Sequence, residues 1–213
     1  MSLRLVAACC CALALPAVAD AATTRTDQTP EQIRAYKDSG AYDKAIAKTY
    51  ASATTYVKAQ LKKHPKKPAV VLDIDETAMS NYTCLDAVDF DLIGLAQCVA
   101  GNKSVAYKPA LAFYKAVRAK KVSVFFITGA PEGLCDGRKG NLAAQGFTGK
   151  LAVTCRPSDD KNDSLVPYKS GARKKIQKQG FTILANVGDQ QSDLSGGAAR
   201  KTFKLVNPIY FTP

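Results

Sequence analysis

Two aspartates, two positions apart, offer the clearest chemistry in this sequence. Asp73 and Asp75 stand in the stretch DIDET, directly after the apolar residues 69–72. A short apolar run of this kind predicts a buried parallel strand, and open α/β sheets bind ligands at the carboxyl ends of such strands. Because side chains alternate along a strand, we expect both carboxylates on one side of the sheet, where they repel each other unless a proton or a cation lies between them. A solvated turn, in which one aspartate caps the next helix, is the alternative interpretation.

Polar residues also stand at the ends of other predicted elements. Thr128 and Gly129 follow a second apolar strand, Lys169 begins a helix, and Asp189 and Asp193 follow a further strand. The carboxyl ends of parallel strands meet at one edge of the sheet, so we expect these groups beside the aspartate pair. A hydroxyl, a backbone N–H and an ammonium group can hold phosphoryl oxygens, while a divalent cation offsets their repulsion from an attacking carboxylate. The sequence therefore predicts a phosphoryl-transfer site, and its hard oxygen ligands favour Mg²⁺.

The acidic residues suggest a division of labour in such a site. Asp73, which shares the cation with Asp189, is expected to attack the phosphorus atom as a nucleophile. Asp75 is placed to protonate the leaving alcohol and then to deprotonate the water that hydrolyses the phosphoaspartate. The single histidine, His64, lies among lysines at a predicted helix end, and this chemistry does not need it.

The elements that would position these residues alternate between strands and helices, which predicts an α/β fold with a doubly wound parallel sheet. Strands are expected at 69–74, 122–127, 151–153, 181–187 and 203–206, and helices at about 30–39, 41–62, 109–120, 131–144 and 168–179. Thr29 before Pro30 is a typical helix start. Residues 78–108 have only weak periodicity, so we expect an insertion that covers the site as a small lid. The polar residues 20–29 are expected to be loosely attached.

The amino terminus has the pattern of a signal peptide. A positively charged start and an apolar stretch too short to span a membrane precede a small-residue cleavage signal that ends at Ala19. We expect residues 1–19 to be removed and residues 20–213 to form one domain of an exported protein, periplasmic or secreted. Lipidation at Cys9 is a weaker alternative. No later apolar run is long enough to cross a bilayer.

The cysteines that remain after the leader favour two disulfides, because exported chains meet an oxidising environment. They are Cys84, Cys98, Cys135 and Cys155. Three pairings are possible, and the sequential one, Cys84 with Cys98 and Cys135 with Cys155, closes the shortest loops. The absence of a Cys-x-x-Cys pair disfavours a metal-binding role for them.

The chain is basic, with 30 lysines and arginines against 18 acids and a net charge of +12, which becomes +11 without the leader. A surface of this sign attracts anionic ligands. No arginine-rich arm, zinc pattern or stacking-aromatic motif points to nucleic acid, so we expect a small phosphomonoester as the partner and no nucleic-acid polymer. Tyr82 and Phe90, in the insertion, either stack on a substrate ring or are buried under the lid.

These motifs resemble those of the haloacid dehalogenase (HAD) superfamily of phosphatases, which carry Asp-x-Asp, Thr-Gly, a lysine and Gly-Asp-x-x-x-Asp in this order. The stretches VLDIDET, FFITG, YKS, GDQQSDL and FKLVNP are similar to subfamily IIIB, the exported acid phosphatase group that includes plant vegetative storage proteins and bacterial secreted acid phosphatases. The resemblance runs from about residue 30 to the carboxyl terminus. It implies a three-layer Rossmann-like fold with N-terminal helices and a small cap insertion after the first strand.

The resemblance also implies roles for single residues. The implied catalytic residues are Asp73, Asp75, Thr128 and Lys169; the implied substrate contacts are Ile74, Thr128, Gly129 and Lys169; and the implied metal ligands are Asp73, Asp75 through its backbone carbonyl, and Asp189, with Asp193 as a supporting acid. Two positions depart from the pattern. Ala130 stands where arginine usually follows Thr-Gly, and Cys135 stands where another arginine is expected six residues before Asn141. Neither position carries the core chemistry, so we expect the departures to alter phosphate support or substrate preference.

The leading hypothesis is therefore an exported, magnesium-dependent acid phosphatase that hydrolyses phosphomonoesters through a phosphoaspartate. A non-catalytic storage or phosphate-binding protein on the same fold is one alternative, and a phosphotransferase is another. The retention of both Asp73 and Asp75 argues against a non-catalytic relative.

Overall fold

A computed structural model describes residues 23–212 of the chain, so the expected leader at 1–19 lies outside the described residues. At its centre is a parallel sheet with the strand order β6-β5-β2-β7-β8. Its strands are β2 (Pro68–Leu72), β5 (Ser123–Pro131), β6 (Ala152–Arg156), β7 (Thr182–Gly188) and β8 (Lys201–Lys204). The expected parallel α/β fold is confirmed. Several bounds differ: β2 ends at Leu72 rather than at residue 74, and β5 continues to Pro131. The strand expected at 151–153 continues to Arg156, and the one expected at 203–206 lies two residues earlier.

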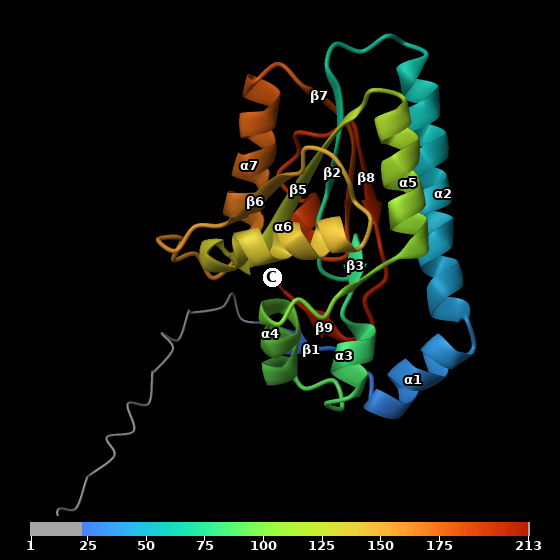
Figure 1. Cartoon of the computed structure of the whole chain (residues 1–213), viewed down its shortest axis with the longest axis vertical. Helices are drawn as coiled ribbons and strands as arrows, with labels where there is room; N and C mark the ends of the chain where they lie inside the picture. The colour runs from blue at the N-terminus through green and yellow to red at the C-terminus, as the bar shows by residue number, and fades with distance from the viewer. Residues whose placement is uncertain (1–22, 213) are drawn as a thin grey trace, which may run out of the picture.

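Helices cover both faces of this sheet, so the molecule has three layers (Figure 1). One face carries α2 (Ala41–Leu61), α5 (Lys108–Ala119) and α6 (Cys135–Ala144), the last preceded by the 3-10 turn η1 (Glu132–Leu134), and the other face carries α7 (Val166–Lys178). On the first face, side chains such as Phe113 and Leu142 pack against Phe126 in the main core. On the second face, Ile176 packs against Val71. The sheet is thereby covered on both faces, as parallel sheets are.

The long helix α2 shows why the sequence pattern found these elements. Its buried residues recur at spacings of three or four and form one face: Tyr42, Ile46, Tyr50, Ala53 and Val57. Before it, α1 (Pro30–Asp38) begins with a capping box, in which the Thr29 hydroxyl accepts from the Gln32 N–H and the Gln32 side chain accepts from the Thr29 N–H. The predicted starts of both helices are confirmed.

The insertion after the first strand forms a cap on the carboxyl edge of the sheet. The short strands β3 (Met79–Ser80) and β4 (Val105–Ala106) pair antiparallel at its base and enclose α3 (Tyr82–Asp86) and α4 (Leu92–Ala100). A disulfide joins Cys84 to Cys98 across these two helices. Phe90 is fully buried and packs edge-to-face on Tyr82, so its ring fills the cap and does not face a ligand.

The expectation that residues 20–29 are loosely attached is wrong for residues 23–29. The strand β1 (Thr24–Arg25) pairs antiparallel with β9 (Tyr210–Phe211), and the Thr26 hydroxyl donates to the Pro208 carbonyl at 2.5 Å. The reason is that residues near the end of the chain provide a strand edge that local composition does not reveal. Residues 20–22 lie outside the described residues.

A second disulfide joins Cys135, at the start of α6, to Cys155 on β6, so the structure has the sequential pairing. Across residues 23–212, the helices all lack the length or the apolar character needed to span a membrane.

Candidate active site

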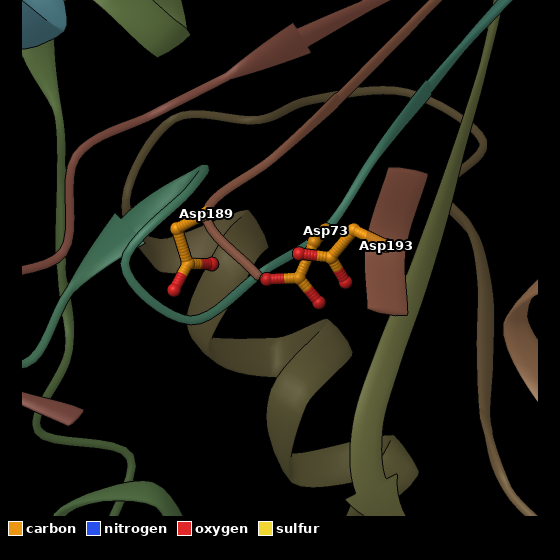
Figure 2. A group of neighbouring side chains, drawn as sticks. All are labelled: Asp73, Asp189 and Asp193. Carbon is orange, nitrogen blue, oxygen red and sulfur yellow. The ribbon is translucent and has the colours of Figure 1, made fainter. Parts of the chain in front are cut away.

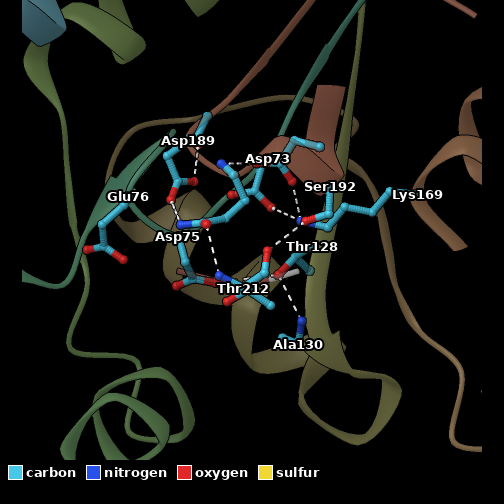
Figure 3. A network of polar contacts seen from close by, with 12 residues as sticks. Asp73, Asp75, Glu76, Thr128, Ala130, Lys169, Asp189, Ser192 and Thr212 are labelled. Atoms are coloured by element: carbon cyan, nitrogen blue, oxygen red, sulfur yellow. Dashed lines mark hydrogen bonds and ion pairs between the residues drawn. The ribbon is translucent and has the colours of Figure 1, made fainter. Parts of the chain in front are cut away.

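Asp73 is the first residue after β2, and hydrogen bonds hold both its backbone and its side chain. Its backbone N–H donates to the Val187 carbonyl on β7 at 3.0 Å. Its carboxylate accepts from the ammonium group of Lys169 at 3.0 Å, and the same ammonium group donates to Asp193. Both carboxylates and the ammonium group are buried. Figure 2 shows Asp73 beside Asp193, and Figure 3 shows Lys169 directed toward Asp73. Lys169 lies in the first turn of α7, close to where the sequence placed it.

Asp73, Asp189 and Asp193 form a buried acidic cluster in which one oxygen of each lies within 4.8 Å of the others. Burial raises the pKa of Asp73 well above its ordinary value, Asp193 adds to this rise, and Lys169 opposes it. Burial lowers the pKa of Lys169, but Asp193 and Asp73 outweigh this effect and raise it. Three carboxylates beside one ammonium group leave a formal charge of −2 when ionised, so the donor set and its charge fit one divalent cation.

Several neutral donors orient Asp189, which follows β7. Its two oxygens accept from the Thr77 hydroxyl at 2.9 Å, the Gln190 side-chain amide at 2.5 Å and the Asn207 amide at 2.8 Å. Burial, followed by the charge of Asp193, raises the pKa of Asp189 to about 6. Because such donors fix the direction of a carboxylate, Asp189 is held ready as a ligand.

Asp193 occupies its place because residue 188 is a glycine. It belongs to the short helix α8 (Gln191–Leu194), and a Cβ added to Gly188 would lie 2.3 Å from the Asp193 Cβ. The free Asp193 oxygen accepts from the Gln190 N–H at 2.8 Å. In the motif Gly-Asp-x-x-x-Asp, the glycine therefore lets the second aspartate lie close against the end of the strand.

Asp75 is held separately from the acidic cluster. Its carboxylate accepts from Arg138 at 2.6 Å, from the Asn81 amide at 2.9 Å and from the Thr128 hydroxyl at 3.4 Å. Arg138 lies on α6, whereas the Lys169 that contacts Asp73 lies on α7, across the sheet. Because β2 ends at Leu72, regular strand alternation does not extend to the two aspartates, and the expectation that both carboxylates lie on one side of the sheet stays a prediction.

Arg138 is a site residue that the sequence analysis missed. Its side chain is 0% exposed, and a second nitrogen donates to the Ser104 hydroxyl of the cap at 3.1 Å. The expected arginine was absent at Cys135, yet Arg138 stands three residues later, which is close to one helical turn. This periodicity was the available signal, because residues three apart share a helix face.

The structure also buries Glu76, the third acid of the DIDET stretch, near Asp75. It has a φ of +49° and is fully buried, where it accepts from the Tyr210 hydroxyl at 2.6 Å and the Asn81 N–H at 2.7 Å. Burial and the nearby Asp75 raise the pKa of Glu76 to about 8. The Glu76 carboxyl therefore holds its proton to a higher pH than an exposed glutamate does.

Thr128 and Gly129 lie in an irregular part of β5, where the pairing with β6 shifts register between Ile127 and Pro131. Thr128 is fully buried, and its hydroxyl accepts from the Ala130 N–H at 3.1 Å. The side chain of Ile74 packs in the main core, so only its backbone is available to a phosphate. Thr128 is thus beside Asp75, as expected.

Residues 207–212 form hydrogen bonds with residues of the site. Asn207 donates to Asp189, Tyr210 donates to Glu76, and the Gln190 side chain bonds both the Tyr210 carbonyl and the Thr212 N–H. Thr212 lies beside the network in Figure 3. The fixed position of residues 207–212 therefore supports two acidic groups of the site.

The chain is similar to known proteins of one phosphatase family. A family model described as HAD superfamily, subfamily IIIB (Acid phosphatase), matches residues 3–213. Acid phosphatase 1 of Solanum lycopersicum is 28% identical over 199 residues, which cover 88% of this chain and 76% of that protein. Vegetative storage protein 2 of Arabidopsis thaliana is 40% identical over 73 residues, which cover 34% of this chain and 27% of that protein.

The fold is shared with a solved structure, the class C acid phosphatase from Bacillus anthracis, with a TM-score of 0.68 at 20% identity over 85% of this chain and 86% of that one. This likeness concerns the fold. The match of the family model over nearly the whole chain decides the assignment: the chain belongs to subfamily IIIB of the HAD superfamily, the acid phosphatases.

Proposed function

We propose that this acid phosphatase is an exported, Mg²⁺-dependent phosphomonoesterase that works through a phosphoaspartate on Asp73. The observation that carries the proposal is the separation of the two aspartates: Asp73 lies in the acidic cluster with Lys169, while Asp75 is held outside it by Arg138. A nucleophile and an acid/base have opposite needs, because one must stay ionised and the other must exchange a proton.

The acidic cluster would hold the metal through Asp73 and Asp189, together with the backbone carbonyl of Asp75, and Asp193 would support it through Lys169. A bound Mg²⁺ would neutralise negative charge and so let a carboxylate approach a phosphate dianion. Hard carboxylate oxygens are the ligands that this cation prefers.

Side chains of the protein carry out the remaining steps, which are nucleophilic attack, phosphate binding and proton transfer. The Asp73 carboxylate attacks the phosphorus atom, while Lys169, Thr128 and the backbone at Gly129 hold the phosphoryl oxygens. Asp75 protonates the leaving alcohol and afterwards takes a proton from the water that hydrolyses the acyl phosphate.

Export is part of the proposal, with cleavage near Ala19. It is supported by the leader pattern at residues 1–19 and by the two disulfides, which persist in oxidising compartments. Sequencing the amino terminus of the mature protein would test it, and a retained leader would contradict it.

The central experiment compares Asp73→Asn with Asp163→Asn, the same change at an exposed loop position. We expect Asp73→Asn to abolish hydrolysis of an aryl phosphate in Mg²⁺ and the control to leave it unchanged. Brief reaction with phosphorus-labelled substrate should also leave label on the wild type that hydroxylamine releases, and no label on Asp73→Asn. Full activity of Asp73→Asn, or of the wild type in chelator, would overturn the mechanism.

The presence of Asp73, Asp75 and the acidic cluster supports catalysis over a purely storage role. The same assay distinguishes a hydrolase from a phosphotransferase if an alcohol is added. Inorganic phosphate as the main product supports hydrolysis, whereas transfer of most label to the alcohol would contradict it.

A further inference from the structure

Many of the exposed cations lie at one end of the molecule, on the helix ends and loops that lead into the five strands of the sheet. We call this set the basic edge, and it consists of Lys58, Lys62, Lys63, Lys66, Lys67, Arg118, Lys120, Lys121, Lys150, Lys175, Lys178, Arg200 and Lys201. Every one of these residues is exposed. The phosphatase chemistry uses none of them.

The basic edge contains no compensating acid. The ranges that form it, 58–67, 116–122, 145–151, 175–181 and 195–201, contain neither aspartate nor glutamate. Within the part of the chain that the structure describes, its cations have no carboxylate within 4.0 Å. The acids between residues 23 and 212 lie elsewhere: in 27–43, in the site and cap at 73–91, and in the segments 132–136, 159–163 and 189–193. The charge is therefore strongly polarised.

The topology explains why separate segments share one end. All five strands are parallel, so the segments that precede them meet at the amino edge of the sheet, opposite the site. In Figure 1, the loops from α2 to β2 and from α7 to β7 lie at the top, while the cap helices α3 and α4 lie at the bottom. Four interstrand spacings make the sheet roughly 19 Å wide, about twice the distance over which salt screens a charge.

The types of side chain in the basic edge indicate which kind of anionic ligand it can bind. Only Arg118 and Arg200 are arginines, and lysine is a hydrated point charge without the planar fork that suits specific phosphate recognition. The nearby rings are covered: Lys67 lies 5.6 Å from the ring of Phe181, and Lys201 lies 5.2 Å from that of Tyr56. Bases of single-stranded nucleic acid would therefore find no open stacking partner.

Deep insertion into a membrane is also disfavoured at this end. Exposed large apolar side chains of the described residues are Val88, Ile93, Val105, Val206 and Phe211, which lie outside the basic edge. What remains is a broad array of lysines that suits a diffuse layer of negative charge. We propose that the basic edge docks the protein on the surface of an anionic phospholipid bilayer, with the active site turned away from the lipid and toward the aqueous phase.

The test is sedimentation of the mature protein with vesicles of equal parts phosphatidylglycerol and phosphatidylcholine, compared with vesicles of phosphatidylcholine alone. We expect binding to the anionic vesicles at about 0.05 M salt and release at about 0.5 M salt, because the contact is electrostatic. Absence of binding to anionic vesicles, or equal binding to both kinds, would overturn the proposal.

A matched pair of variants locates the contact. One variant combines Lys62→Gln, Lys66→Gln, Lys120→Gln and Lys175→Gln within the basic edge, and the other combines Lys44→Gln, Lys103→Gln, Lys139→Gln and Lys161→Gln at exposed positions outside it. Both lose the same net charge. We expect the first to bind at least about tenfold more weakly and the second to bind nearly as well as the wild type.

Two results would contradict the proposal. Equal weakening of both variants would mean that net charge alone attracts the protein. Tighter binding to duplex DNA than to anionic vesicles, at matched phosphate concentration and salt, would identify nucleic acid as the better partner. Melting temperatures of both variants should match the wild type, because every substituted lysine is exposed.

Discussion

Replacement of Arg138 by glutamine should make the enzyme selective for substrates that do not need an acid. The substitution removes the shortest of three contacts to Asp75, at 2.6 Å, and leaves those with Asn81 at 2.9 Å and Thr128 at 3.4 Å. The remaining partners allow the Asp75 carboxylate to move. A nitrophenolate leaves as a stable anion, whereas an alkoxide must be protonated as it leaves, so displacement of Asp75 affects the alkyl substrate more.

The expected fall in kcat follows from the rate enhancement that a misplaced general acid no longer provides. A general acid contributes about 10²- to 10⁴-fold to a rate, and a displacement of about 1 Å costs about 10²-fold. We expect kcat for an alkyl phosphate to fall about 100-fold, equivalent to about 2.7 kcal/mol of transition-state stabilisation, and kcat for nitrophenyl phosphate to fall less than about tenfold. KM should change little for either, because Arg138 touches Asp75 and the cap in the structure.

Loss of Arg138 also affects folding, so stability must be measured beside activity. Removing one partner of a fully buried ion pair costs about 3 to 5 kcal/mol, and the cost here should be smaller because the Asp75 side chain is 16% exposed. Arg156→Gln is the matched control: Arg156 is buried and paired with Asp160, away from Asp75. Equal losses of kcat on alkyl and aryl substrates for Arg138→Gln, or the same selectivity in Arg156→Gln, would refute the reasoning.

Three further predictions concern metal binding and stability. Because the pKa of Asp189 is raised to about 6, Mg²⁺ affinity measured by calorimetry should fall below that pH as protons compete with the cation, and a pH-independent affinity would contradict this. The pKa of Glu76 is raised from 4.5 to about 8 in the folded protein, so between these pH values the folded state keeps a proton on Glu76 that the unfolded state has lost. The metal-free protein should therefore lose several kcal/mol of stability as the pH rises from 4.5 to 8. Denaturant titrations across this range should show a flatter profile for Glu76→Gln, and an unchanged slope would exclude Glu76 as the cause. Replacing Cys84 and Cys98 together by serine should lower the free energy of unfolding by about 3 kcal/mol, and an unchanged unfolding midpoint would argue against a stabilising bridge.

The sequence predicted those parts of the molecule that depend on local pattern. The apolar run that becomes β2, the helix start at Thr29 and Pro30, and the bounds of α2 are set by neighbouring residues, so local pattern and capping rules predicted them. The rule that the carboxyl ends of parallel strands meet at one edge also predicted that Asp73, Lys169 and Asp189 lie together, and the structure brings their side chains together.

The features that were missed depend on contacts between distant residues. Arg138 reaches Asp75 across 63 positions of sequence, and Tyr210 reaches Glu76 across 134. The pairing of β1 with β9 likewise joins two stretches that have no strong strand pattern of their own. Propensity rules see only near neighbours, so such contacts need the folded chain.

The contacts of residues 207–212 have a consequence for how the protein is made. Synthesis proceeds from the amino to the carboxyl end, so Asp73 and Asp189 exist in the growing chain before Asn207 and Tyr210 have been added. One of the three donors to Asp189 and one of the donors to Glu76 are therefore added to the growing chain after both acids. We therefore expect a chain that has been synthesised only as far as residue 206 to carry all the acids of the site but to lack the hydrogen bonds from Asn207 and Tyr210.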